Sequence, residues 1–107
     1  MRKIVESLLT LQEEELVLAE SRILHQGQKD ADLTRLETHI RATREKLKPD
    51  YLRRYDLLRR NGLGVVRESA GVCSGCHLNV PVGDLNRMRR GQMPWICPNC
   101  ARFLLLT

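Results

Sequence analysis

Apolar side chains in the first part of the chain recur at alternating steps of four and three residues. The repeat is formed by Val5, Leu9, Gln12, Leu16, Ala19 and Ile23, with Gln12 as its one polar member, and Leu8, Leu11 and Val17 widen it. Steps of this size place side chains on one face of an α-helix. The pattern predicts one amphipathic helix over residues 3 to 26, about 36 Å long at about 1.5 Å per residue.

A polar stretch at residues 25 to 32, HQGQKDAD, interrupts the repeat and predicts a turn between two helices. Gly27 suits the position just after a helix, and Asp30, Asp32 or Thr34 suits the N-cap of the next one. A second apolar stripe follows, made of Leu33, Leu36, Ile40, Thr43 and Leu47. Two such helices can bury their stripes against each other, which predicts an antiparallel coiled-coil hairpin, or against a second copy, which predicts a homodimer.

The hairpin is predicted to end near Pro49, because proline cannot continue a helix but is well suited to begin one. We expect the second helix to end or kink near Lys48 and a further helical segment to run over residues 50 to 60. The sequence Asn-Gly-Leu-Gly at residues 61 to 64 indicates a hinge into a different kind of structure.

Short strands and one short helix are expected after the hinge. Strands are predicted at residues 65–67, 77–80, 94–96 and 103–106. Residues 81–90 should form one or two helical turns, with Val82, Leu85 and Met88 turned inward.

Composition shows that packing alone is a weak source of stability here. Only 4% of the 107 residues are aromatic, with a single Trp and a single Phe. Domains of this size with few large side chains need a further source of stability, such as a bound metal.

Charge is distributed unevenly along the chain. Residues 1–50 carry nine Lys/Arg against ten Asp/Glu, a net charge of −1, whereas residues 51–107 carry nine arginines against three carboxylates, a net charge of +6. The basic character therefore belongs to the second half. No long apolar run is present, and Glu6 interrupts the start of the chain where a signal peptide would be apolar, so we expect a cytoplasmic protein.

The four cysteines form two Cys-x-x-Cys pairs, Cys73 with Cys76 and Cys97 with Cys100, separated by twenty residues. This is the ligand spacing of a structural zinc site, in which four thiolates surround the metal as a tetrahedron. In a reducing compartment, such pairs indicate a metal rather than disulfides. We expect one structural Zn²⁺, although the same ligand set holds iron in rubredoxin-like proteins, and a red colour would indicate that metal.

Residues 51–107 resemble the zinc ribbon family of bacterial coiled-coil proteins with an all-cysteine site. The matching features are Tyr55, Leu57-Leu58-Arg59, Gly64-Val65-Val66, Cys73-Ser74-Gly75-Cys76-His77, Val80-Pro81, Leu85-Asn86, Gly91, Ile96-Cys97-Pro98-Asn99-Cys100, Arg102 and Leu104. The resemblance implies a helical hairpin followed by a ribbon, and adaptors that bind nucleic acid or protein in RNA metabolism, transcription or flagellar assembly. This chain departs from it in a much shorter hairpin and in Ala101, where the family usually has Gly.

The fold class predicted from these observations is a small α+β metal-bound protein. Residues 1–60 are expected to form the coiled-coil hairpin and residues 61–107 the four-cysteine zinc ribbon. A site with four protein sulfurs leaves no position for water or substrate, and no nucleophile-base pair stands out in the sequence, so we do not expect an enzyme.

Arginine is the candidate group for binding, because its guanidinium pairs with phosphate through two parallel hydrogen bonds. The residues expected to contact RNA or DNA are Arg59, Arg60, Arg67, Arg87, Arg89, Arg90 and Arg102. A solvated basic face is the plainer interpretation. Trp95 is expected to pack in the core, Tyr51 and Tyr55 to pack the helix end against the ribbon, and His77 to lie outside the ligand set.

Protein partners remain the alternative. Transcription factors of the DksA type insert an acidic-tipped helical hairpin into RNA polymerase and carry a four-cysteine zinc site beside it. The present chain is similar in the order of its parts, but its hairpin is short and the sequence at the tip, QKDAD, differs. The helix stripes could also dock another protein, including a component of the transcription machinery.

Overall fold

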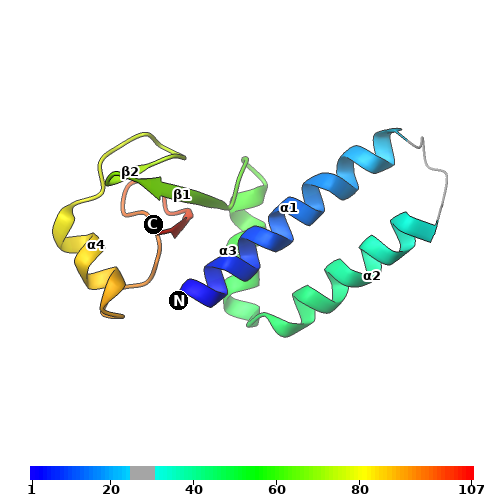
Figure 1. The fold of residues 1–107 in the computed structure, drawn as a ribbon, viewed down its shortest axis with the longest axis horizontal. Coiled ribbons are helices and arrows are strands. Elements are labelled where there is room, and N and C mark those ends of the chain that lie inside the picture. The colour runs from blue at the N-terminus through cyan, green and yellow to red at the C-terminus, as the bar shows by residue number, and fades with distance from the viewer. Residues whose placement is uncertain (25–30) are drawn as a thin grey trace.

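The computed structural model describes residues 1–24 and 31–107, and these form four helices and three short strands. The helices are α1 (Arg2–Leu24), α2 (Ala31–Lys46), α3 (Pro49–Arg59) and α4 (Val82–Arg89), and the strands are β1 (Val65–Ser69), β2 (Val72–Cys73) and β3 (Phe103–Leu105). The molecule is elongated, with extents of 50 × 26 × 21 Å. The sheet and α4 lie at one end, α1 and α2 extend away from them, and α3 crosses behind α1 (Figure 1).

Helices α1 and α2 lie side by side in opposite directions (Figure 1). Arg22 pairs with Glu37 at 3.2 Å near one end of the contact, and Glu15 pairs with Arg44 at 3.1 Å near the other. The α2 stripe is confirmed at Leu33 and Ile40, which are both buried.

The stripe predicted for α1 is wrong in its second half. Leu16, Val17 and Ile23 are 43%, 52% and 77% exposed, whereas Leu18, which was not assigned to the stripe, is buried. Helix α1 also contacts β1 and β3, so its buried face has to serve the sheet as well as α2. That face runs through Val5, Leu8 and Leu11. Coiled-coil packing of α1 against α2 stays a prediction.

The break at Pro49 is confirmed. Helix α2 ends at Lys46, and α3 begins at Pro49 with Lys48 in an extended conformation at its N-cap. Proline at this position costs no hydrogen bond, because the first N–H groups of a helix have no intrahelical partner. Asp32 and Thr34 lie inside α2, while Gly27 and Asp30 fall outside the described residues. The division of the chain at residue 60 stays a prediction.

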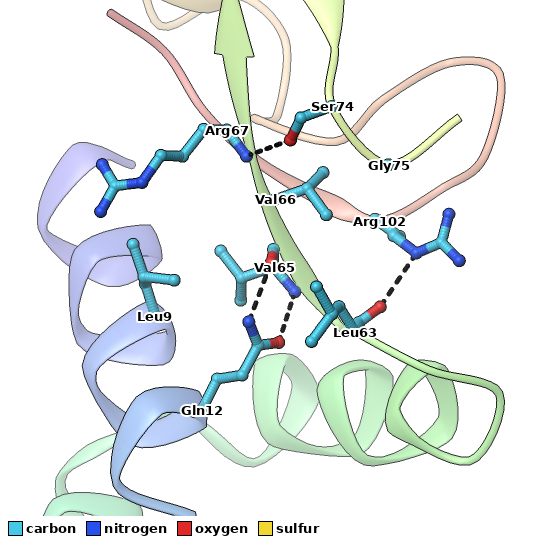
Figure 2. A pocket seen from close by; sticks show the side chains of 9 residues that line it. All are labelled: Leu9, Gln12, Leu63, Val65, Val66, Arg67, Ser74, Gly75 and Arg102. Atoms are coloured by element: carbon cyan, nitrogen blue, oxygen red, sulfur yellow. Dashed lines mark hydrogen bonds between the residues drawn. The ribbon is translucent and has the colours of Figure 1, made fainter. Parts of the chain in front are cut away.

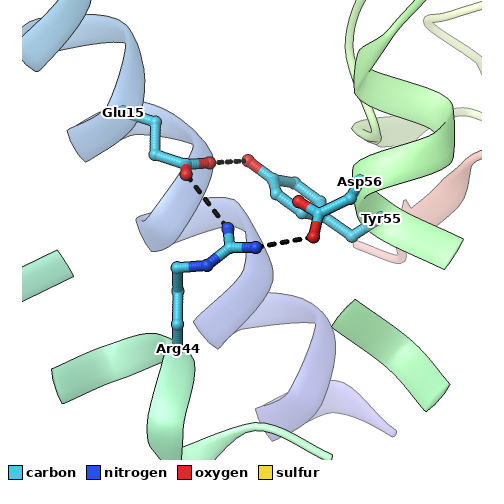
Figure 3. A network of polar contacts seen from close by, with 4 residues as sticks. All are labelled: Glu15, Arg44, Tyr55 and Asp56. Atoms are coloured by element: carbon cyan, nitrogen blue, oxygen red, sulfur yellow. Dashed lines mark hydrogen bonds and ion pairs between the residues drawn. The ribbon is translucent and has the colours of Figure 1, made fainter. Parts of the chain in front are cut away.

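A polar network joins the three long helices around the buried ring of Tyr55 (Figure 3). The Tyr55 hydroxyl donates to Glu15 Oε1 at 2.6 Å, and Arg44 donates to Glu15 Oε2 at 3.1 Å and to Asp56 Oδ2 at 2.6 Å. Burial and the Glu15 carboxylate raise the pKa of Tyr55. The network fixes how α3 sits against α1 and α2.

The sheet is centred on β1, which pairs in antiparallel fashion with β2 and in parallel with β3. The registers align Glu68 with Cys73 and Val65 with Phe103. The strands predicted at 65–67 and 103–106 are confirmed. Those predicted at 77–80 and 94–96 are wrong, since each contributes a single bridge, Val72 with Asn79 and Ile96 with Phe103.

Gln12 explains why one polar residue belongs in the apolar face of α1. Its side chain is buried, and its Oε1 accepts hydrogen bonds from the backbone N–H groups of Gly64 at 2.8 Å and Val65 at 2.9 Å. Its Nε2 donates to the Val65 carbonyl at 3.0 Å (Figure 2). The side chain therefore takes the place of a neighbouring strand at this point of β1 and docks α1 onto the sheet.

The contact between α3 and the sheet rests on aromatic rings, as predicted for Tyr51 and Tyr55. Tyr51 meets Phe103 edge to face, with ring centroids 6.3 Å apart. Tyr55 lies against Gly64, where an added Cβ would come within 2.9 Å of the ring. Only glycine therefore fits at position 64, where the chain passes over this ring before β1 begins.

Helix α4 packs on the other side of the ribbon through Leu85 and Met88, which are buried. Val82 was predicted to turn inward and is instead 72% exposed, because the helix begins at this residue and its first turn projects from the ribbon. Trp95 is buried, donates from Nε1 to the Met88 carbonyl at 2.8 Å and is covered by Arg2 at 5.0 Å from its ring centroid. The prediction that Trp95 belongs to the core is confirmed.

No helix in the described part of the chain has both the length and the apolar character needed to cross a membrane.

Candidate metal centre

Two turns with the same hydrogen-bond pattern hold the cysteines. In the first, His77 N–H donates to the Cys73 carbonyl at 2.8 Å and Cys73 N–H to the Leu78 carbonyl at 3.0 Å. In the second, Ala101 N–H donates to the Cys97 carbonyl at 2.9 Å and Cys97 N–H to the Arg102 carbonyl at 2.9 Å. Because both turns have the same backbone hydrogen bonds, the two sulfurs of each Cys-x-x-Cys segment point in the same direction, toward the other pair.

The residue after each turn adopts a left-handed backbone conformation, with φ of 62° at His77 and 64° at Ala101. This conformation favours glycine, and other residues reach it at a cost. The strain expected at Ala101 from the sequence is thus located at the end of the second turn.

Replacing Ala101 by Gly should raise the free energy of unfolding by about 1 kcal/mol, because a Cβ in the left-handed region costs about 1–2 kcal/mol, part of which the freer unfolded chain offsets. Chemical unfolding of the zinc-loaded protein at fixed free zinc measures the change. Ala42→Gly, within α2, is the matched control and should lower stability by about 1 kcal/mol. A destabilised Ala101→Gly variant would show that the strain is absent.

The four Sγ atoms form one cluster in which all lie within 4.8 Å of one another. Cys73 Sγ is 3.8 Å from Cys100 Sγ, and Cys76 Sγ is 3.8 Å from Cys97 Sγ. A tetrahedron with Zn–S bonds of about 2.3 Å has edges of about 3.8 Å. The cysteines are unpaired as disulfides, and their spacing fits one structural zinc ion.

Ionisation of the thiols is coupled to metal binding. Burial raises the pKa of Cys97 to about 12 and also raises the pKa of Cys73. Burial opposes ionisation at Cys100 too, but hydrogen bonds from the backbone and side chain of Arg102 outweigh it and lower the pKa of Cys100 to about 7. Zinc must therefore displace protons at neutral pH, and its affinity falls as the pH falls.

Arg102 connects the metal cluster to the rest of the fold. Its Nε donates to the Leu63 carbonyl at 2.9 Å, and its side chain lies against Gly75, where an added Cβ would be 3.2 Å from the Arg102 Cδ. A cation beside four thiolates offsets part of the negative charge that they carry once zinc is bound. Arg102 was predicted as a nucleic-acid contact, and its position gives it a structural role as well.

The predicted arginines do not gather in one place. Arg87, Arg89 and Arg90 belong to α4 and the residue after it, while Arg59 and Arg60 stand at the end of α3. These two helices lie on different sides of the sheet (Figure 1). Arg67 projects from β1, on the far side of that strand from Arg102 (Figure 2).

Two features near the cysteines were not identified as site residues from the sequence. Leu57 and Arg54 line a hollow that reaches Cys100. The sequence signals were the place of Leu57 in the zinc ribbon resemblance, the place of Arg54 in the basic second half, and a spacing of three that puts both on the same face of α3. His77 is exposed and stands outside the cluster of four sulfurs, as predicted.

Comparison with known proteins supports the metal centre. Residues 72–104 match the family model of the C4-type zinc ribbon domain, which confirms the resemblance noted from the sequence over this segment. No curated protein matches the chain. A solved structure, that of CT398 from Chlamydia trachomatis, is similar over 89% of this chain, with 26% identity and a TM-score of 0.62. The present chain spans 39% of that protein's chain.

Proposed function

We propose that this protein is a non-catalytic, cytoplasmic zinc-binding adaptor that binds nucleic acid through the arginines of its ribbon. The zinc ribbon itself rests on the cysteine cluster and the matched family model. Nucleic acid as the partner is inferred from the basic surface, and a role in transcription or RNA regulation goes with it.

The observation that carries the proposal is that few carboxylates are available to pair with the arginines of the ribbon. Within residues 51–107 the acids are already engaged: Asp56 pairs with Arg44, Asp84 pairs with Arg87, and buried Glu68 accepts from Thr107 and Gly71. Among the described residues, six of the seven predicted arginines, all except Arg87, have no ion-pair partner within 4 Å. Guanidinium groups without an ion-pair partner suit phosphate, and of these six Arg59 and Arg102 also donate to the backbone carbonyls of Gly62 and Leu63.

The surface favours phosphate contacts over base recognition. Trp95 and Phe103 are buried and Tyr51 is half-buried, so in the described ribbon no Trp, Phe or Tyr ring is exposed for stacking bases, and His77 is the exposed ring that is left. We therefore expect binding that depends strongly on salt and weakly on sequence.

A salt titration of zinc-loaded protein with mixed-sequence single-stranded RNA and with duplex DNA tests this. The logarithm of the association constant should fall linearly with the logarithm of salt concentration, with a slope of about −0.7 per phosphate contact for single strands. Changing Arg87, Arg89 and Arg90 to Glu should abolish binding. The same charge change at Arg35, Arg41 and Lys46 of α2 should leave binding almost unchanged. No binding at about 50 mM salt would refute the proposal.

A protein partner is the second candidate, favoured by the apolar side chains that α1 leaves exposed: Leu16, Val17, Ile23 and Leu24. A homodimer through the hairpin, or binding to RNA polymerase in the manner of DksA-type factors, would cover them. Replacing Leu16 and Val17 by Ser separates the two candidates, since it should weaken protein association and leave nucleic-acid binding intact.

A further inference from the structure

Two hollows lie on either side of Arg102, next to the zinc cluster. The first, of about 320 Å³, lies between α1, β1 and the first cysteine turn (Figure 2). The second, of about 380 Å³, lies between α3 and Cys100 of the second turn. Each is near the lower limit of about 300 Å³ for ligand sites, a size that suits the side chains of a bound segment.

The linings combine apolar walls with arginine. Leu9, Val65 and Val66 contribute to the first hollow, and Leu57 and Leu58 contribute to the second. Leu57 in the last turn of α3 and Leu63 just before β1 remain 54% and 42% exposed, so part of the apolar surface is open to solvent.

Apart from the zinc ligand Cys100, the charged side chains at these walls are all arginines. Arg54 and Arg102 line the second hollow, and Arg67 and Arg102 line the first. No carboxylate is among the residues that line either hollow in the described structure. Arg54 reaches the Ala101 carbonyl only at 3.5 Å, a contact that leaves most of its hydrogen-bonding capacity unused.

We propose that this arginine-flanked apolar surface is a docking site for an acidic peptide segment that carries leucine-like side chains. Apolar side chains of the segment fill the hollows, and its carboxylates meet Arg54, Arg67 and Arg102. Charge complementarity selects an acidic occupant. A nucleic acid fits less well, because its sugar-phosphate chain has no apolar groups for the leucine and valine walls and no aromatic ring lines the hollows for stacking.

The site shares Arg67 and Arg102 with the arginines predicted to contact nucleic acid, but it does not include Arg87, Arg89 and Arg90, which the nucleic-acid test changes. A chain with both sites could hold a nucleic acid at one side of the ribbon and a protein segment at the other. Failure of nucleic-acid binding through Arg87, Arg89 and Arg90 would leave the peptide site unaffected.

The test measures binding of a fluorescein-labelled peptide of glutamate and leucine to the zinc-loaded full chain by fluorescence anisotropy. Leu57→Gln and Arg54→Glu should each weaken binding by about tenfold or more. The matched controls are Val82→Gln, an exposed apolar site on α4, and Arg53→Glu, a neighbour on α3 outside the hollow. Both controls should stay within about twofold of the parent chain.

Two altered peptides complete the test. Replacing every glutamate of the probe by glutamine, or every leucine by serine, should abolish binding. Oligouridylate should not displace the parent peptide from the variant in which Arg87, Arg89 and Arg90 are changed to Glu. Equal binding of the serine peptide, displacement by oligouridylate, or equal losses in the test and control variants would each overturn the proposal, because the surface would then recognise charge alone.

Discussion

Removing zinc should unfold the ribbon and move the fluorescence of the single tryptophan to longer wavelength. Trp95 is 6% exposed, two residues before Cys97, and packs under α4 and the first residues of the chain. Zinc binding contributes on the order of 10 kcal/mol to the folding of small zinc modules. With few large side chains to replace that free energy, the sheet should not persist without the metal.

A chelator titration followed by Trp95 emission and by circular dichroism measures this effect. Cys97→Ser should reproduce the metal-free spectrum even when zinc is present, because three thiolates no longer close the site. The purified protein should be colourless and contain one zinc per chain. An unshifted Trp95 emission in protein shown by elemental analysis to be free of metal would contradict the prediction.

Replacing Gln12 by Leu should lower the free energy of unfolding by about 3 kcal/mol. The change leaves three buried backbone groups without partners, namely the Gly64 N–H, the Val65 N–H and the Val65 carbonyl, and each such group costs about 1–3 kcal/mol. Leucine has nearly the same volume, so the loss is due to hydrogen bonding rather than to a cavity.

Chemical unfolding of the zinc-loaded variant gives the stability, and hydrogen exchange locates the effect. The amides of Gly64 and Val65 should exchange faster in Gln12→Leu than in the parent chain. Glu13→Leu is the control, since Glu13 is the neighbouring residue on the same helix and is exposed. Unchanged protection of the two amides would mean that Gln12 does not dock the helix.

The parts of the fold that local pattern controls could be predicted from the sequence. Cysteine spacing identified the metal ligands because a Cys-x-x-Cys turn is closed by its own backbone bonds. Pro49 marked a helix boundary because the constraint lies within the proline ring. The helices α1, α2 and α4 were located for the same reason, since their apolar residues repeat with the helical period.

Features that depend on tertiary contacts were missed. The β1–β2 hairpin turns at Ala70 and Gly71, with φ of 50° and 80°, and alanine gives no sequence signal for a left-handed turn. The buried face of α1 was misassigned after Gln12, because the spacing of apolar residues does not show that α1 packs against the sheet as well as against α2. The arginines were correctly seen as a basic excess, but their division between α3, β1 and α4 follows from the topology of the ribbon.

Docking of α1 through Gln12 also makes zinc affinity and helix position mutually dependent. The strand that Gln12 binds continues into Arg67, whose carbonyl accepts from the N–H of Ser74 inside the first cysteine turn at 2.9 Å. By thermodynamic reciprocity, the factor by which bound zinc raises the equilibrium constant for docking of α1 equals the factor by which docking raises the affinity for zinc. A partner that binds α1 in its docked position would thus raise the affinity for zinc, and one that displaces the helix would lower it.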